Sequence, residues 1–295
     1  MRGLRRISSR DFAAGGPSGY TFGDCVVNFI KYQGLGNDFI MLTADGAAKE
    51  LTAALAVQLC QRGHSIGGDG VMVAVPATDD DDASWVMLLL NSDGSTPEMC
   101  GNGIRCFVKH VVEALGATEN PLRVRTPGGV RACAWQRDAE DAVIAVRVDM
   151  GSPSFERAIV PMTGSGLAHH VSVAVRDTTF NATGVNTGNP HMVVFGDASR
   201  ETALRWGPTL TAHPMWPEGA NVEFAHVQSR DAIDVTVWER GCGLTQACGT
   251  GATATAAAAI ARGMADFDTP IAVKLPGGTL TITIEADFAR AWMEG

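Results

Sequence analysis

A motif that occurs twice, CGNG at residues 100–103 and CGTG at residues 248–251, indicates the fold of this chain. Each copy comes directly before a segment of helical character. Residues 104–115 carry apolar side chains at helical spacing, and residues 252–262 are rich in alanine. A glycine follows each segment, as a left-handed C-terminal cap requires: Gly116 and Gly263. The sequence therefore predicts two helices that each begin at a Cys-Gly-X-Gly motif.

Other landmarks repeat around the two motifs in the same order. A Pro-Gly-Gly turn follows each helix, at Pro127 and at Pro276. Upstream, Asn91 and Glu239 each lie nine residues before their cysteine, at the end of an apolar stretch. A single large domain with an accidental echo of the motif would not repeat so many landmarks in order. We therefore expect two similar halves, residues 27–149 and residues 150–295.

Short segments of alternating or β-branched character recur in both halves and predict strands. They are residues 71–75, 85–90, 143–148, 171–175, 192–195, 233–238 and 280–284. Helices are fewer, about two in each half, and include residues 52–61. This pattern indicates an α+β fold with two pseudo-symmetric α/β domains, each a mixed sheet wrapped around a central helix.

Residues 1–26 stand apart from both halves. They contain four arginines, several serines and the stretch GGPSG at residues 15–19. An organellar transit peptide can have this composition, and so can a disordered tail. The segment has no amphipathic apolar face, so we expect a disordered N-terminal extension.

The composition excludes several classes of protein. Hydrophobic residues make up 45% and charged residues 19% of the chain, as in soluble globular proteins. No apolar run is long enough to span a membrane, and a net charge of −9 disfavours nucleic acid as a partner. Seven cysteines without a CxxC pair are typical of reduced thiols in the cytoplasm. Cys106 and His110 lack the paired spacing of a zinc site, so we expect no metal.

A cysteine at a helix start can act as an acid or a base. Unpaired backbone N–H groups and the helix dipole favour negative charge there, which lowers the pKa of the thiol. One such motif is weak evidence, but two in halves related by a two-fold axis would place Cys100 and Cys248 on opposite sides of a shared cleft. One thiolate could then remove an α-proton while the other thiol protonates the opposite face. No lysine lies in a recognisable pyridoxal-phosphate context, so we infer no cofactor.

The segments around these landmarks resemble the diaminopimelate epimerase family. They are KYQGLGNDF (31–39), NSDGSTPEMCGNGIRC (91–106), NTGNPHMVV (186–194), GANVEF (219–224) and ERGCGLTQACGTG (239–251). The resemblance extends from residue 27 to the end of the chain. Proline racemases and hydroxyproline epimerases share the cysteine pair but typically carry CGHG at the first cysteine. The resemblance implies an isomerase that interconverts LL- and meso-diaminopimelate in lysine and peptidoglycan-precursor synthesis, without cofactor, as a cytoplasmic homodimer.

The resemblance also implies roles for individual residues. Cys100 and Cys248 would be the catalytic acid/base pair, and Arg240 would bind the distal carboxylate of the substrate. Glu239 would face an ammonium group and, with His191, adjust the thiols. The polar ends of the substrate would be bound by four asparagines: Asn37, Asn91, Asn189 and Asn221. The reacting carboxylate would be held by the helix starts: Gly101, Asn102, Gly249 and Thr250.

Alternatives remain open for several of these residues. Asparagine beside glycine is often only a turn former, which applies to Asn37, Asn91 and Asn221. His191 could be a satisfied loop histidine, and Arg240 a surface charge at a strand end. For the whole chain, the rivals are an isomerase of another small carboxylic acid and a non-catalytic ligand-binding or redox-sensing protein.

The chain departs from the family pattern in three places. Gly70 stands where some members carry glutamine, and Leu244 stands where glutamate is common. Members usually continue beyond the position of Gly295 with a strand that returns to the first domain. Its absence predicts an unpaired edge in the first sheet.

Overall fold

The computed structural model describes residues 5–8, 20–22, 25–43, 47–78 and 82–295. It divides into two compact units, Met1–Val146 and Arg147–Gly295. The disorder was expected for residues 1–26, and most of these residues lie outside the part of the chain that the structure describes. The described residues near this end form three short strands: β1 (Arg5–Ser8), β2 (Tyr20–Phe22) and β3 (Cys25–Val27).

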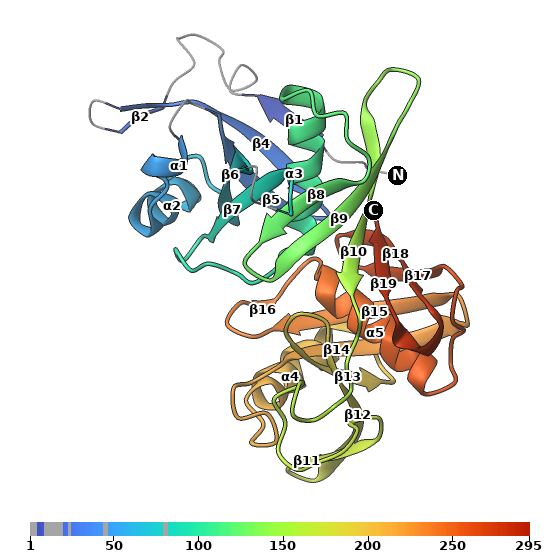
Figure 1. The fold of residues 1–295 in the computed structure, drawn as a ribbon. Coiled ribbons are helices and arrows are strands. Elements are labelled where there is room, and N and C mark those ends of the chain that lie inside the picture. The colour runs from blue at the N-terminus through green and yellow to red at the C-terminus, as the bar shows by residue number, and fades with distance from the viewer. Residues whose placement is uncertain (1–4, 9–19, 23–24, 44–46, 79–81) are drawn as a thin grey trace. The chain divides into compact units, whose positions relative to one another are not determined.

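The first unit contains a mixed sheet whose strands follow one another in chain order (Figure 1). They are β4 (Phe29–Gly34), β5 (Asn37–Leu42), β6 (Gly70–Pro76), β7 (Trp85–Asn91), β8 (Leu122–Thr126) and β9 (Gly129–Arg137). Successive pairs alternate between antiparallel and parallel, beginning with the antiparallel pair β4 and β5. One edge of this sheet, along β4, is paired with β1, so the expectation of an unpaired edge is wrong along β4.

The second unit repeats this alternation of strand pairs. Its strands are β11 (Val171–Val175), β12 (Thr178–Asn186), β13 (Pro190–Phe195), β14 (Asn221–Ser229), β15 (Ala232–Glu239), β17 (Ile271–Leu275), β18 (Gly278–Ile284) and β19 (Ala291–Glu294). The pairs from β12 to β18 run antiparallel, parallel, antiparallel, parallel and antiparallel, as they do from β4 to β9. The predicted α+β class, with two similar mixed-sheet halves, is confirmed.

Two further strands complete the second unit. The short β16 (Gly243–Leu244) pairs with β15. Strand β10 (Val143–Gly151) begins in the first unit and ends in the second, where its last residues pair with β19.

Each unit has one helix that is buried along almost its whole length. In the first unit this is α3 (Gly101–Ala114), which packs against β4, β5 and β6. In the second unit it is α5 (Gly249–Ala261), which packs against β12 to β15 and β17 to β19 (Figure 1). A helix without an exposed face belongs in a core. Both predicted helices are confirmed, as are their left-handed caps, since Gly116 has φ 73° and Gly263 has φ 71°.

In the first unit, α1 (Ala47–Glu50) and α2 (Ala53–Cys60) pack on the sheet, and in the second unit α4 (Arg200–Thr211) does so. The short 3₁₀ helix η2 (Ala286–Phe288) connects β18 and β19. In the first unit, successive side chains of β5 and β6 point to opposite faces of the sheet. Ile40 and Val71 therefore pack towards α2, while Phe39 and Met72 point to the opposite face. None of the helices in the described residues is long and apolar enough to cross a membrane.

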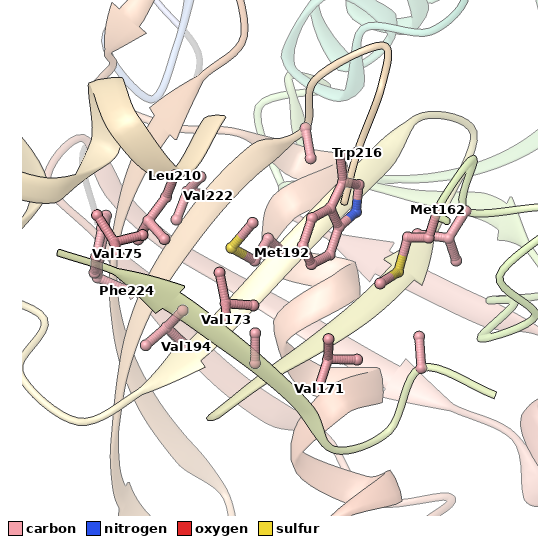
Figure 2. Packing of buried hydrophobic residues seen from close by; sticks show 14 of the residues in the cluster. Met162, Val171, Val173, Val175, Met192, Val194, Leu210, Trp216, Val222 and Phe224 are labelled. Carbon is pink, nitrogen blue, oxygen red and sulfur yellow. The ribbon is translucent and has the colours of Figure 1, made fainter. Parts of the chain in front are cut away.

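The second unit has an apolar cluster on the face of the sheet that α4 covers. Figure 2 shows Met192, Trp216 and Phe224 within this cluster, to which α4 contributes Ala203 and Leu210. Strands β13 and β14 are therefore buried on both faces, by this cluster on one side and by α5 on the other. As a result, polar side chains on the α5 face of these strands are removed from water.

Candidate functional site

Both motif cysteines are the N-cap residues of the central helices. Cys100 has φ −133° and ψ 101°, and Cys248 has φ −131° and ψ 113°, so the two backbones have the same conformation. The Sγ atom of Cys100 accepts a hydrogen bond from the Gly103 N–H at 3.3 Å, and that of Cys248 accepts one from the Gly251 N–H at 3.4 Å. Each sulfur therefore lies at a helix start, where the backbone N–H groups favour an anion.

In the first unit, polar side chains connect the helix start to the sheet. Asn102 Nδ2 donates to Asn37 Oδ1 at 2.6 Å, and Asn37 Nδ2 donates to Asp69 Oδ2 at 3.2 Å. Asp69 also accepts from the Asp38 N–H at 2.9 Å and from Arg62 at 2.9 Å. The structure thus brings together Cys100, Gly101, Asn102 and Asn37. We call these four residues and Asn91 the first half-site.

Asn91 lies at the end of β7, opposite Gly70 of β6. Gly70 in turn pairs with Phe39 of β5, so the three residues lie at neighbouring register positions of the sheet. The Asn91 side chain donates to Ser95 Oγ at 3.0 Å across a tight turn. This contact agrees with the alternative interpretation of Asn91 as a turn former. It uses the side-chain nitrogen of Asn91 and not the side-chain oxygen.

In the second unit, a buried histidine lies between two oxygen atoms. His191 Nε2 is 2.7 Å from Asn189 Oδ1, and His191 Nδ1 is 2.7 Å from Glu223 Oε1. Both ring nitrogens therefore have a hydrogen-bonding partner, one the Glu223 carboxyl and the other the Asn189 amide. His191 and Glu223 have no exposed surface, and His191 is therefore not a loop histidine.

Asn221 and Glu239 lie on the same face of the sheet as His191, and Arg240 follows at the end of β15. Asn221 pairs with His191 across β13 and β14, and its Oδ1 accepts from the Arg240 N–H at 2.9 Å. Glu239 Oε1 accepts from the Thr245 hydroxyl at 2.6 Å. Arg240 is exposed and donates to the Glu218 carbonyl at 2.9 Å. We call Cys248, Gly249, Thr250, Asn189, His191, Asn221, Glu239 and Arg240 the second half-site.

The surroundings of Cys248 oppose ionisation of its thiol. Burial raises the pKa of Cys248 well above its usual value, and the carboxylates of Glu239 and Glu223 raise it further. Hydrogen bonds from the Thr250 hydroxyl and the Gly251 N–H lower it, but they do not outweigh the other causes. The expectation of a lowered thiol pKa is therefore wrong for Cys248, because desolvation and like charge exceed the effect of the helix start.

Glu239 is subject to the same burial. Desolvation raises the pKa of Glu239, while the hydrogen bond from Thr245, the charge of His191 and an interaction with the Cys248 thiol lower it. The carboxyl of Glu239 thus lies within interaction range of both His191 and Cys248. The role of Glu239 and His191 in adjusting the second thiol stays a prediction.

Three charged residues of this arrangement were missed by the sequence interpretation: Asp69, Arg105 and Glu223. Glu223 follows Val222 and precedes Phe224 in a strand of apolar residues, so a lone charge in a buried strand was the available signal. Arg105 lies at helical spacing with Lys109 and Glu113, which in the sequence indicates a solvated polar face, so its burial gave no local signal. Asp69 lies in a Gly-Gly-Asp-Gly loop that reads as an ordinary turn. No group of three metal-ligating side chains occurs among the residues that the structure describes.

Comparison with known proteins extends the match from the two motifs to nearly the whole chain. The family model described as diaminopimelate epimerase matches residues 29–156 and 183–295. The chain belongs to the diaminopimelate epimerase family. A diaminopimelate epimerase of Heliobacterium modesticaldum is 39% identical over 274 residues, which cover 91% of this chain and 96% of the relative. The diaminopimelate epimerase of Synechocystis is 39% identical, with coverage of 91% and 95%.

Solved structures of other isomerases share the fold of the diaminopimelate epimerase family. A probable proline racemase from Agrobacterium radiobacter superposes with a TM-score of 0.66 at 14% identity, covering 91% of this chain and 89% of that one. A hydroxyproline epimerase from Agrobacterium vitis has a TM-score of 0.65 at 15% identity, with the same coverage. At these identities the likeness concerns the fold alone.

Proposed function

We propose that this protein is a cofactor-independent epimerase that interconverts LL- and meso-2,6-diaminopimelate. The observation that carries the proposal is the pair of cysteine N-caps, with matching backbone angles at Cys100 and Cys248. Each cap supplies one sulfur atom and a set of helix-start N–H groups, so a substrate carbon acid would meet an acid/base group and an anion site in each half. Membership of the diaminopimelate epimerase family supports this substrate.

The proposed reaction moves one proton onto the enzyme and another onto the substrate. One cysteine, as the thiolate, takes the proton from the α-carbon and becomes a thiol. The other cysteine, as the thiol, gives its proton to the opposite face of the carbanion and becomes a thiolate. The configuration at the α-carbon inverts, and the enzyme pair still holds one proton in total. The mechanism requires the two helix starts to flank the α-carbon, and this arrangement is part of the proposal.

The helix starts would stabilise the charge that develops during proton removal. The N–H groups of Gly101, Asn102, Gly249 and Thr250 would hold the reacting carboxylate, because oriented backbone dipoles stabilise an enolate-like charge in a water-poor site. Thr187 supports the second helix start through a hydrogen bond from its hydroxyl to the Thr250 carbonyl at 3.1 Å.

The remaining residues of the two half-sites would select a substrate with a carboxylate and an ammonium group at each end. Arg240 would bind the distal carboxylate with its planar guanidinium, and Glu239 would face an ammonium group. His191 and Glu239 would adjust the thiol of Cys248. The neutral amides would bind the other polar atoms: Asn37, Asn91, Asn189 and Asn221.

The proposal includes the cellular setting. We expect a cytoplasmic homodimer that serves lysine and peptidoglycan-precursor synthesis and binds neither nucleic acid nor membrane. Its two functional halves would be residues 27–149 and residues 150–295.

Incubation with LL-diaminopimelate in deuterated water tests the activity. We expect the meso isomer to form with deuterium at the inverted α-carbon, and we expect Cys100→Ala and Cys248→Ala to abolish this reaction. Cys242→Ala is a matched control, because Cys242 is exposed and lies outside both half-sites. Absence of exchange in the intact protein would contradict the proposal. Turnover of proline or hydroxyproline instead would replace the substrate but keep the two-cysteine chemistry.

Mild oxidation tests whether the two sulfurs flank one carbon. A disulfide requires Cα atoms about 4.4–6.8 Å apart, so a Cys100–Cys248 bond can form only if the two helix starts approach each other. We expect reversible inactivation together with a cross-linked peptide that contains both cysteines. Persistence of both thiols after oxidation would argue against the flanking arrangement.

A further inference from the structure

The first half-site contains a buried cation that the reaction scheme above does not use. Arg105 lies on α3 five residues after Cys100 and is only 1% exposed. Its Nη1 donates to the Gly101 carbonyl at 2.9 Å, and its Nη2 donates to Asn102 Oδ1 at 2.9 Å. Removing a guanidinium from water is costly, so its presence here calls for a benefit beyond the packing of one helix.

Comparison with the second unit distinguishes two properties of Arg105: its hydrogen bond to the helix-start carbonyl and its positive charge. Thr253 lies five residues after Cys248, and its hydroxyl donates to the Gly249 carbonyl at 2.9 Å. Thr253 thus makes the same helix-start contact as Arg105 with a small neutral group. The contact itself therefore needs no charge, and the positive charge is the feature specific to the first unit.

The sheet positions that face the two helix starts differ in the opposite sense. Phe39 in the first unit is equivalent to His191 in the second. Phe39 pairs with Gly70, the first residue of the parallel strand β6, and His191 pairs with Asn221, the first residue of the parallel strand β14. Two residues further along that strand, Met72 corresponds to Glu223. The second thiol is thus surrounded by carboxylates, while the first has apolar sheet residues and a cation on its own helix.

We propose that Arg105 is a positioning residue for Cys100, which holds Asn102 at the helix start and favours the thiolate by a buried positive charge. This inference rests on the proposed function in so far as Cys100 is one of the two acid/base groups. A neutral residue at position 105 would leave the first thiol without the charge that distinguishes it from the second.

The titration of the neighbouring groups agrees with this role. Burial lowers the pKa of Arg105, and the ionised forms of Cys106 and Cys100 counteract this effect. Burial raises the pKa of Cys106 to about 12, so Cys106 stays a neutral thiol near pH 7. Cys106 therefore supplies no negative charge next to Arg105 near pH 7.

Other charged and titratable groups around α3 have partners of their own. Lys109 pairs with Glu113 at 2.6 Å, and His110 Nδ1 is 3.0 Å from the Tyr32 hydroxyl. A cluster of ions comprises Lys31, Asp38, Arg62 and Asp69. Its Asp69 carboxylate accepts a hydrogen bond from the Asn37 amide, which in turn accepts one from Asn102. Glu98 lies exposed in the loop before Cys100. Substitution of Arg105 leaves all of these groups in place.

The test is the pH dependence of the reaction of Cys100 with iodoacetamide, followed by mass spectrometry of the Cys100 peptide. The variants are Arg105→Met, which removes the charge, and Arg105→Lys, which keeps the charge but lacks the two separate nitrogens that reach the Gly101 carbonyl and Asn102 Oδ1. In Arg105→Met we expect the midpoint of the pH profile for alkylation of Cys100 to rise by about one pH unit, so alkylation near pH 7 slows about tenfold. In Arg105→Lys we expect an unchanged midpoint with a loss of kcat/KM, because Asn102 is no longer held. Thr253→Val is the control and should leave the Cys100 profile unchanged.

An unchanged midpoint in Arg105→Met would overturn the proposal. If Arg105→Met does not fold, Arg105→Gln takes its place, since it keeps a donor and removes the charge. Alkylation requires no turnover, so the result is independent of the proposed activity. A shifted midpoint in a protein that fails to epimerise diaminopimelate would keep the role of Arg105 and reject the function.

Discussion

Replacement of Gly251 by alanine tests the position of the buried Glu223 carboxylate. A Cβ atom at Gly251 would lie 2.7 Å from Glu223 Oε1 and 3.3 Å from Cys248 Sγ. Glu223 cannot easily move, because it has no exposed surface and its Oε1 is held by His191 at 2.7 Å. Gly103 is the matched position in the first unit, where a Cβ atom would meet Cys100 Sγ at 3.1 Å and the flexible Leu89 side chain at 3.5 Å.

The expected free energies follow from these contacts. Overpacking of a rigid site costs about 1–3 kcal/mol, and alanine in place of glycine within a helix stabilises by about 1 kcal/mol. Gly251→Ala should therefore lose up to about 2 kcal/mol of unfolding free energy, while Gly103→Ala should lose none. At about 2–4 °C for each kcal/mol, the melting temperature of Gly251→Ala should fall by several degrees. Activity should also fall in Gly251→Ala, because the shift displaces Cys248.

Thermal and urea unfolding of both variants measure the difference, and hydrogen exchange of peptides from α3 and α5 assigns it to a unit. We expect faster exchange over α5 in Gly251→Ala and unchanged exchange over α3 in Gly103→Ala. Equal stability of the two variants would refute the reasoning, since it would mean that the Glu223 carboxylate is not fixed beside the second helix start.

Three further predictions concern packing and titration. In Gly207→Ala, the new Cβ would lie 2.5 Å from the Trp238 ring, so melting curves should show a loss of about 1–3 kcal/mol; wild-type stability would contradict this packing. Burial raises the pKa of Cys106 from 9.0 to about 12, so the folded state keeps a proton that the unfolded chain releases. Stability should fall by about 1.4 kcal/mol per pH unit above pH 9 in urea unfolding, and this part of the slope should be absent in Cys106→Ala. Burial raises the pKa of Glu239, and the hydrogen bond from the Thr245 hydroxyl limits this rise. Thr245→Val should therefore move the acid limb of kcat/KM to higher pH, and an unmoved limb would exclude ionised Glu239 from the reaction.

The sequence was sufficient to predict the repeat and its central helices. Hydrophobic periodicity, glycine caps and the spacing of the two motifs are local signals, and the structure places α3 and α5 where these signals indicated. The predicted strands are likewise present, for example β6, β7 and β15. Pairing partners were less accessible, because the register depends on residues far apart in the chain.

Helix α4 shows why local rules can miss an element. It contains Gly207 and Pro208, two residues that normally interrupt a helix. Gly207 is required because the Trp238 ring approaches the helix backbone, which only the tertiary structure reveals. The strand β1 was missed for a similar reason, since its partner β4 lies beyond a glycine-rich stretch and nothing near residues 5–8 indicates pairing.

The chemistry of the candidate site was only partly accessible from the sequence. The N-cap positions of Cys100 and Cys248 followed from the motifs, but the sign of the pKa shift at Cys248 did not. That sign depends first on burial of the thiol and then on the carboxylates of Glu239 and Glu223, which β15 and β14 bring beside the helix start. Burial and through-space charge are properties of the folded chain, so a motif alone could not supply them.

The composition of α5 limits how the second unit can change during evolution or design. Apart from Ile260, the helix consists of glycine, alanine and threonine, and it is buried from Gly249 to Ile260. Its backbone therefore runs close to the surrounding strands, and any larger side chain would push the helix axis away from them. A mutational scan should find α5 almost intolerant of enlargement along its whole length, whereas α4 should accept bulky substitutions at its exposed positions. Variation in substrate choice would have to arise in the loops, and the scaffold behind Cys248 would stay constant.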